Sequence, residues 1–156
     1  MYIMIKENDI DYIIPNLYLG NYESSKNMAY IKKYNIKYII CIMVNIDEQF
    51  KNNKEITYFH IPIKDEQDCK NIKVNYKILF DDITKLIDYL LRLNNGSILV
   101  HCKKGHHRSA AIVAHYLVNY HNYELKTVIN YIKQKRPLAL RRNCCIMDNL
   151  WYYNKN

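Results

Sequence analysis

Glycine and proline are both rare in this 156-residue chain, with three residues of each. Where glycine does occur, we therefore expect a sharp turn or a close approach of two backbone segments. Gly20 follows Leu-Tyr-Leu, Gly96 precedes Ser-Ile-Leu-Val, and Gly105 lies within the segment Cys102–Arg108. Tight backbone geometry is predicted at all three positions.

Long apolar runs are also missing. No run of about 18 apolar residues occurs, so no transmembrane helix is expected, and Met1–Asp11 lacks the apolar core of a signal peptide. Hydrophobic residues make up 49% of the chain and charged residues 24%, which is ordinary for a globular protein. Because there is no repeat and no linker, residues 1–156 are predicted to form a single domain.

The cysteines lack any Cys-x-x-Cys spacing. They form an odd set of five: Cys41, Cys69, Cys102, Cys144 and Cys145. Such a set does not indicate a disulfide scaffold. We predict reduced thiols and a cytoplasmic, reducing compartment.

Acidic residues are outnumbered by basic ones, 15 to 23, and the formal net charge is +8. A basic protein favours anionic partners, such as phosphorylated side chains, nucleic acid or an acidic membrane surface. The charge does not choose among them. Taken alone, the charge favours a solvated basic surface without a specific partner.

Apolar periodicity predicts alternating strands and helices. The expected strands are Tyr12–Ile14, Leu17–Leu19, Ile36–Val44, Thr57–Ile61 and Ser97–Val100. The first expected helix is capped by Ser24 or Ser25 and carries Met28, Ile31 and Tyr34. The second, Val74–Leu93, has an apolar stripe that includes Ile78. The remaining expected helices are Ser109–Tyr120, Glu124–Lys135 and Cys144–Tyr153. This order predicts an α/β fold, a three-layer sandwich with a mainly parallel central sheet flanked by helices.

The stretch Ile98–Ala110 combines a buried strand, a loop and the start of a helix. In that geometry, successive backbone N–H groups and the helix N-terminus form a cradle for an anion such as phosphate. Cys102 at the base of the cradle is in a positive field, which favours the thiolate, a strong nucleophile toward phosphorus. The planar guanidinium of Arg108 can clamp two phosphoryl oxygens.

Two neighbours of these residues have predicted supporting roles. Ser109 is placed to donate a hydrogen bond to the Cys102 thiolate, and His101 is expected to order the loop by hydrogen bonding. The alternatives are that Cys102 is a buried structural cysteine, or that Cys102, His106 and His107 form a zinc site. No second cysteine lies at a metal-ligand spacing from these residues, so we expect no metal.

The chain contains His-Cys-x5-Arg-Ser, and with this motif it resembles the dual-specificity protein phosphatases of the cysteine-dependent protein tyrosine phosphatase superfamily. The resemblance covers most of the chain. It extends to Ile14–Gly20, to Ile61-Pro62-Ile63-Lys64-Asp65, and to Arg136-Pro137 followed by Asn143. It implies a protein tyrosine phosphatase-like fold and hydrolysis of phosphate monoesters through a phosphocysteine intermediate, without a cofactor.

The resemblance also implies a proton donor and a supporting residue. The Ile-Pro-x-x-Asp match implies that Asp65 is the general acid. Asp68 is the alternative candidate. A third possibility is that both residues are solvated acids on the surface. Asn143 is similar to the Asn that supports the family's phosphate loop. The chain departs from the family in a longer connector between Asp65 and Cys102, and in Arg142 where a proline is usual.

Substrate class is predicted from the pocket that the resemblance implies. The chain has no room for the segment that deepens the pocket of phosphotyrosine-only enzymes, so phosphotyrosine and phosphoserine/phosphothreonine on proteins are the expected substrates. The predicted phosphate-binding residues are Lys103, Lys104, Gly105, His106, His107 and Arg108. The basic residues among them, with Arg141 and Arg142 further along the chain, favour phosphoinositide or RNA 5′-phosphate as the alternative substrate. A catalytically silent phosphate-binding module is the third hypothesis, although it usually lacks the Cys or the Arg.

Overall fold

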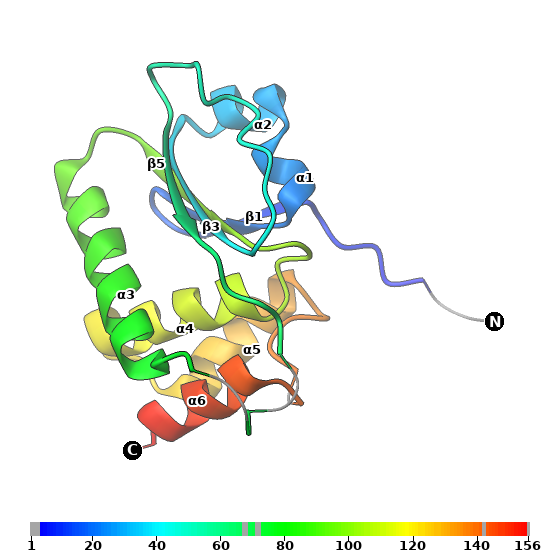
Figure 1. The fold of residues 1–156 in the computed structure, drawn as a ribbon, viewed down its shortest axis with the longest axis vertical. Coiled ribbons are helices and arrows are strands. Elements are labelled where there is room, and N and C mark those ends of the chain that lie inside the picture. Colours follow the sequence, from blue (N-terminus) through cyan, green and yellow to red (C-terminus); the bar gives the residue numbers. More distant parts are fainter. Residues whose placement is uncertain (1–3, 67–68, 71–72, 142, 156) are drawn as a thin grey trace.

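Strands and helices alternate along the chain (Figure 1), which the computed structural model describes for residues 4–66, 69–70, 73–141 and 143–155. The strands are β1 (Ile10–Ile14), β2 (Leu17–Gly20), β3 (Ile36–Ile42), β4 (Thr57–Ile61) and β5 (Ser97–His101). The helices are α1 (Tyr22–Ser25), α2 (Met28–Lys33), α3 (Tyr76–Leu93), α4 (Arg108–His121), α5 (Leu125–Lys135) and α6 (Cys145–Tyr153). Each predicted strand and each helix after Val74 is found within two residues of its expected bounds.

The central sheet has the strand order β1-β2-β5-β3-β4. β1 and β2 form an antiparallel hairpin, whereas β5 pairs in parallel with both β2 and β3, and β3 pairs in parallel with β4. The sheet is therefore mixed and mainly parallel, as predicted. β5 is the middle strand of this order, and all five of its residues are buried. The segment that follows β5 therefore leaves the sheet at its centre.

Helices cover both faces of the sheet (Figure 1). The larger core lies between one face and α3, α4, α5 and α6, and it contains Ile98 and Val100 of β5. Leu99, which points to the opposite face, packs with Ile31 of α2 in a smaller core. The result is the expected three-layer sandwich. In the parts of the chain described here, no helix combines the length and the apolar character needed to cross a bilayer.

The first helical region differs from the prediction. It forms two short helices, and their N-caps are Asn21 and Asn27, whose side chains accept hydrogen bonds from Ser24 N and Ala29 N. Ser24 and Ser25 lie inside α1, where their hydroxyls donate to backbone carbonyls one turn earlier. The predicted serine caps were wrong because Asn caps a helix as well as Ser does, and this chain is rich in Asn.

The apolar stripe predicted for α3 was too broad. Phe80, Ile83, Ile87 and Leu90 are buried, but Ile78 is 56% exposed. Ile78 lies on the solvent side of the first turn, next to the Asn75 cap that accepts its N–H. The helical period places it outside the buried face.

Two cysteines predicted to be reduced are paired. Cys69 and Cys145 form a disulfide between residues 76 positions apart, with a Cα–Cα distance of 5.3 Å. Cys41, Cys102 and Cys144 are free and buried. The prediction failed because fold topology, which residue spacing does not reveal, brings the segment after β4 to the start of α6.

Candidate active site

The loop between β5 and α4 is tightly constrained at Gly105. Its φ of +71° is in the left-handed region, which glycine adopts without strain. A Cβ there would lie 2.5 Å from the carbonyl oxygen of Gly20 and 2.9 Å from Nη2 of Arg136. Glycine is required at this position both by conformation and by contact, as the sequence predicted.

The backbone carbonyls of the loop point outward. Five consecutive carbonyls accept hydrogen bonds from other parts of the chain: Cys102 from His101 Nδ1, Lys103 from Tyr22 N, Lys104 and Gly105 from Arg136, and His106 from Leu140 N. In a trans peptide the next N–H points opposite to the carbonyl. The N–H groups of residues 103–107 therefore face the inside of the loop, and none has a hydrogen-bond acceptor among the described residues. Free, converging N–H groups are suited to bind an oxyanion.

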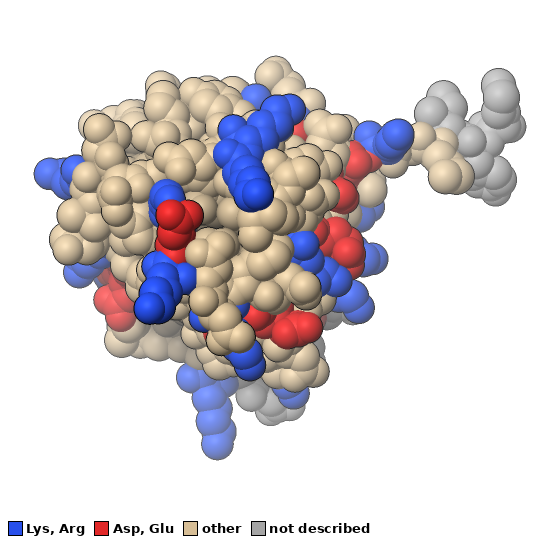
Figure 2. All heavy atoms as spheres, turned by 90° about the horizontal axis from the view of Figure 1, so that it is seen from above, with Lys and Arg blue, Asp and Glu red and all other residues tan. Residues whose placement is uncertain are grey.

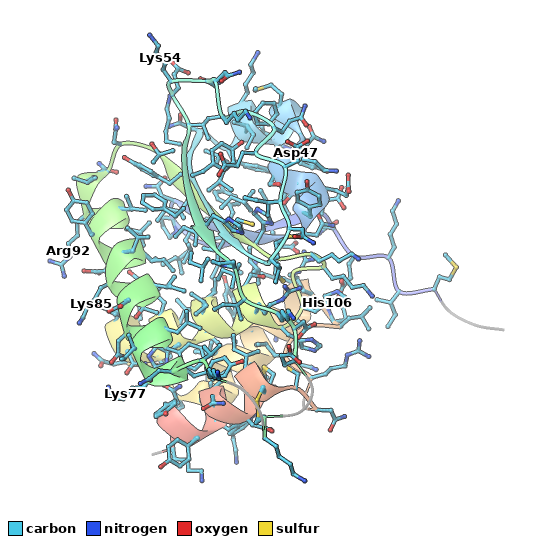
Figure 3. The ribbon with its side chains drawn as sticks, in the orientation of Figure 1. Asp47, Lys54, Lys77, Lys85, Arg92 and His106 are labelled. Carbon is cyan, nitrogen blue, oxygen red and sulfur yellow. A yellow bond between two sulfur atoms is a disulfide. The ribbon has the colours of Figure 1, made fainter. Side chains whose placement is uncertain are left out.

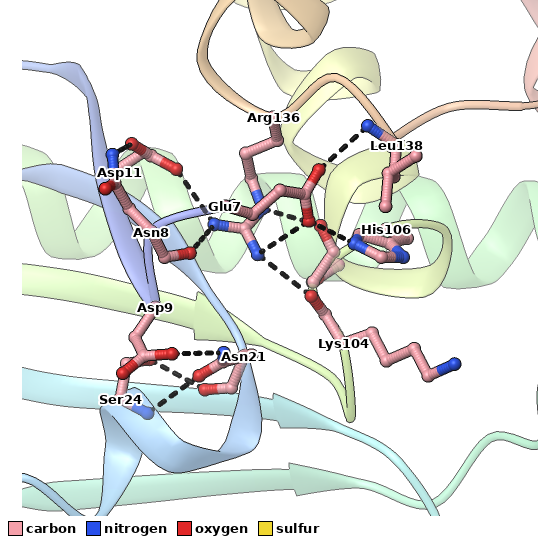
Figure 4. Close-up of polar contacts among 12 residues, drawn as sticks. Glu7, Asn8, Asp9, Asp11, Asn21, Ser24, Lys104, His106, Arg136 and Leu138 are labelled. Atoms are coloured by element: carbon pink, nitrogen blue, oxygen red, sulfur yellow. Dashed lines mark hydrogen bonds and ion pairs between the residues drawn. The ribbon is translucent and has the colours of Figure 1, made fainter. Parts of the chain in front are cut away.

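Arg136 holds this loop from behind (Figure 4). Its side chain is 1% exposed, and its Nε and Nη2 donate to Gly105 O and Lys104 O at 3.0 and 2.9 Å. Nη1 pairs with Asp11 at 2.8 Å, and Glu7 lies on the other side. In the sequence, Arg136 is recognisable only as part of a family-like closing segment. An arginine directly before Pro137 was the one signal of its role.

Cys102 lies at the base of the loop. The hydroxyl of Ser109 donates to its Sγ at 3.1 Å. His101 donates from Nδ1 to the Cys102 carbonyl at 3.1 Å, and burial lowers the pKa of His101 to about 4, so this imidazole is neutral at physiological pH. Both contacts are those expected for residues that support a nucleophile.

Arg108 begins α4 and is 8% exposed. Its Nη1 donates to the Ile63 carbonyl at 2.9 Å, which fixes one edge of the guanidinium. Its Nε is buried and has no partner within the described ranges. A buried charged donor without an acceptor is costly, and a bound oxyanion would satisfy it.

Asp65 approaches the loop from the segment after β4. Its carboxylate lies 3.6 Å from Nδ1 of His107. Interaction with His107 lowers the pKa of Asp65 below its usual value against the opposing effect of burial, and the charge of Arg108 acts in the same direction. Asp68, the rival acid, lies outside the described residues.

These residues line one pocket of about 170 Å³: Asp65, Cys102, Lys103, Lys104, His106, His107, Arg108 and Arg141. The structure thus brings Asp65 and Arg141 to the loop from distant parts of the chain. The pocket carries one acid among several basic groups, which suits a dianionic ligand.

Two predicted site residues are placed differently from the rest. His106 pairs with Glu7, so its imidazole is held by the protein as well as lining the pocket. Asn143 is exposed, with φ of 86°, and no hydrogen bond joins its side chain to the loop in the described part of the chain. Its supporting role stays a prediction, whereas Arg136 and Leu140 hold the loop. Arg142 lies outside the described residues.

Basic residues also occur away from this pocket. Figure 3 shows Lys77, Lys85 and Arg92 along α3, well away from His106. On the face in Figure 2, basic and acidic side chains are scattered among each other. The lining of the pocket itself includes Lys103, Lys104, Arg108 and Arg141.

Comparisons with known proteins agree with this geometry. The family model of the dual specificity phosphatase catalytic domain matches residues 17–156. The chain belongs to this family. Human dual specificity protein phosphatase 7 is 33% identical over 124 residues, which are 80% of this chain and 28% of that protein. Arabidopsis thaliana dual specificity protein phosphatase 1 is 31% identical over 123 residues, 79% of this chain and 58% of that protein.

The fold has matches among solved structures. The crystal structure of DUSP15 has a TM-score of 0.79 and 29% identity, covering 94% of this chain and 87% of that chain. This likeness bears out the predicted phosphatase-like α/β fold. The chain spans less than two thirds of the length of the curated relatives named above.

Proposed function

We propose that this protein is a cysteine-dependent phosphatase that hydrolyses phosphotyrosine and phosphoserine/phosphothreonine on proteins. The observation that carries the proposal is the shared pocket of Cys102 and Arg108, enclosed by loop N–H groups that have no acceptor among the residues the structure describes. Membership of the dual specificity phosphatase family supports it.

The proposed reaction has two steps. The Cys102 thiolate attacks phosphorus while Arg108 and the loop N–H groups hold the three equatorial oxygens, and Asp65 gives a proton to the leaving oxygen. Water then attacks the phosphocysteine, with Asp65 accepting a proton. The Ser109 hydroxyl, 3.1 Å from Sγ, stabilises the departing thiolate.

Hydrolysis of a small aryl phosphate in the presence of a metal chelator tests the activity. Turnover that is abolished by Cys102→Ser supports the proposal. If the wild-type protein binds phosphate analogues but gives no turnover, it is a binding module.

The substrate class is tested with phosphopeptides, inositol lipids and RNA carrying a 5′-triphosphate. The small pocket and the family favour phosphopeptides of all three phosphorylated residues. Lys103, Lys104 and Arg141 at the pocket are the observation that favours the alternative, phosphoinositide or RNA phosphate. Preferential turnover of lipid or RNA would establish that alternative.

The general acid is tested with Asp65→Asn and Asp68→Asn on an alkyl phosphate, whose poor leaving group needs a proton. Asp65 lines the pocket, so Asp65→Asn is expected to flatten the basic limb of the rate profile. If only Asp68→Asn does so, Asp68 is the acid.

We also propose a cytoplasmic location, where a catalytic thiol stays reduced. The test is to quench cells with acid, alkylate the free thiols and count the alkylated cysteines of this protein. The structure pairs Cys69 with Cys145. Five alkylated thiols in the quenched cells would support the proposal, and a Cys69–Cys145 disulfide found in those cells would contradict it.

A further inference from the structure

Three side chains, two of which line the pocket, form a cluster that the proposed reaction uses only in part. They are Asp65, His107 at the start of α4, and Cys144 at the start of α6. One potential ligand atom from each lies within 4.8 Å of the other two. In the described residues, no other trio of His, Cys, Asp or Glu side chains is arranged in this way.

The donor set fits zinc. Carboxylate oxygen, imidazole nitrogen and thiolate sulfur all bind Zn²⁺ at about 2.0–2.3 Å, so tetrahedral ligands lie about 3.3–3.6 Å apart. Starting from separations within 4.8 Å, shifts of about 1 Å suffice. Asp65 lies outside the regular elements, where such a shift is easily made.

Two of the three side chains have unused binding capacity. Cys144 is a free thiol, 3% exposed, whereas the sulfur of neighbouring Cys145 is bonded to Cys69. The His107 ring has a buried Nε2 without a partner in the described part of the chain. Arg108 Nε, the other buried atom without a partner in the described ranges, is assigned to phosphate. Neither His107 Nε2 nor the Cys144 thiol has a role in the proposed reaction.

We propose that Asp65, His107 and Cys144 bind one zinc ion, with water completing the coordination, and that bound zinc inhibits the protein. On binding, a Zn–S bond replaces the S–H bond of Cys144 and the proton passes to solvent. The inhibition rests on the proposed function, because Asp65 cannot donate a proton while its oxygen is a ligand. The zinc site itself does not depend on that function.

The binding test uses Co²⁺ as a spectroscopic probe, because cobalt bound to a thiolate gives a charge-transfer absorption. The three free cysteines provide matched variants. The absorption is expected in the wild type, in Cys41→Ser and in Cys102→Ser, and it is expected to disappear in Cys144→Ser. Its absence from the wild type, or its loss in Cys102→Ser with retention in Cys144→Ser, would overturn the site.

The inhibition test titrates Zn²⁺ against turnover of an aryl phosphate. Cys144→Ser is expected to keep turnover and to need more than about tenfold more zinc for half-inhibition, whereas Cys41→Ser behaves as the wild type. Equal zinc sensitivity of Cys144→Ser and wild type contradicts the proposal. If no protein shows turnover, the proposed function has failed while the cobalt result still decides the zinc site.

Cys144 is buried, so a serine there can disturb folding. In that case His107→Asn removes another ligand and leaves the core intact. Loss of the cobalt absorption in His107→Asn supports the site, and an unchanged absorption contradicts it.

Discussion

At the scale of single residues, the reactive sulfur depends on one hydroxyl and one guanidinium. Ser109 contacts the sulfur directly, and Arg108 is oriented by the Ile63 carbonyl with its Nε left for a ligand. Ser109 thus acts on the sulfur, and its neighbour in sequence, Arg108, acts on the phosphoryl group to which the sulfur becomes bonded. Their separate effects can be measured.

Ser109→Ala is expected to slow breakdown of the phosphocysteine more than its formation. A hydrogen bond to a charged group contributes about 1.5–3 kcal/mol, so the steady-state rate should fall about 10- to 150-fold. Rapid-quench kinetics with an aryl phosphate should still show a burst of product. Ser25→Ala, which removes another buried helical hydroxyl, is the control. A slow burst with an unaffected second step would refute this role.

His107→Asn is expected to move the basic limb of the rate profile to higher pH. His107 lowers the pKa of Asp65, so in the wild type this acid loses its proton at a lower pH than usual. An uncharged side chain removes that effect, the pKa rises, and Asp65 stays protonated to higher pH. The measurement is kcat/KM against pH for an alkyl phosphate with a chelator present, and His121→Asn at the end of α4 is the control. A limb that stays in place or moves to lower pH argues against Asp65 as the acid.

At the scale of elements, the loop is held by segments that are far apart in sequence. The N-terminal segment supplies Glu7, β1 supplies Asp11, and the segment after α5 supplies Arg136 (Figure 4). The same segment also supplies the Leu140 N–H. α1 adds the Tyr22 N–H. The cradle is therefore a property of the assembled fold and not of the His-Cys-x5-Arg-Ser segment alone.

Arg136→Met is expected to lower the free energy of unfolding by roughly 3–5 kcal/mol, because it leaves Asp11 and two loop carbonyls buried without their partner. Urea denaturation measures the loss, and the release of the loop should also lower kcat/KM. Arg92→Met is the control. Arg92 pairs with Asp88 on the surface of α3 and is 78% exposed, so its removal should cost less than about 0.5 kcal/mol. Equal losses for the two variants would show that Arg136 does not hold the loop.

The limits of the sequence prediction also lie at this scale. Periodicity located β4, β5 and α3–α6, because each has a strong apolar pattern. It missed the split between α1 and α2, where asparagine caps decide the boundary. The motif identified Cys102 and Arg108, but the carbonyl contacts of Arg136 and the meeting of Asp65, His107 and Cys144 depend on tertiary contacts that no local pattern contains.

At the scale of the whole molecule, buried histidines link folding to pH. Burial lowers the pKa of His101 to about 4, and burial also lowers the pKa values of His106 and His115. Glu7 keeps a lowered pKa despite its burial, because Leu138 N and His106 contact its carboxylate. Both kinds of shift make the native state bind fewer protons than the unfolded chain.

The free energy of unfolding is therefore expected to fall as the pH falls. Below the ordinary histidine pKa of 6.5, His101 is protonated in the unfolded chain but stays neutral in the native state. The resulting decrease in the free energy of unfolding from this residue approaches about 3 kcal/mol near pH 4. Glu7 adds to the loss only below its ordinary value of 4.5. Urea titrations between pH 4 and pH 8 measure the trend, and His101→Asn should make it shallower. Stability that is constant over this range would contradict the burial of neutral histidines.

The central claim is that Cys102 becomes phosphorylated during turnover, and trapping the intermediate tests it most directly. The protein is mixed with an aryl phosphate, quenched in acid within one turnover and digested for mass spectrometry. The account predicts a phosphoryl group on the peptide that contains Cys102, absent from Cys102→Ser and more abundant in Ser109→Ala. Turnover without this adduct, or an adduct on another residue, would contradict it.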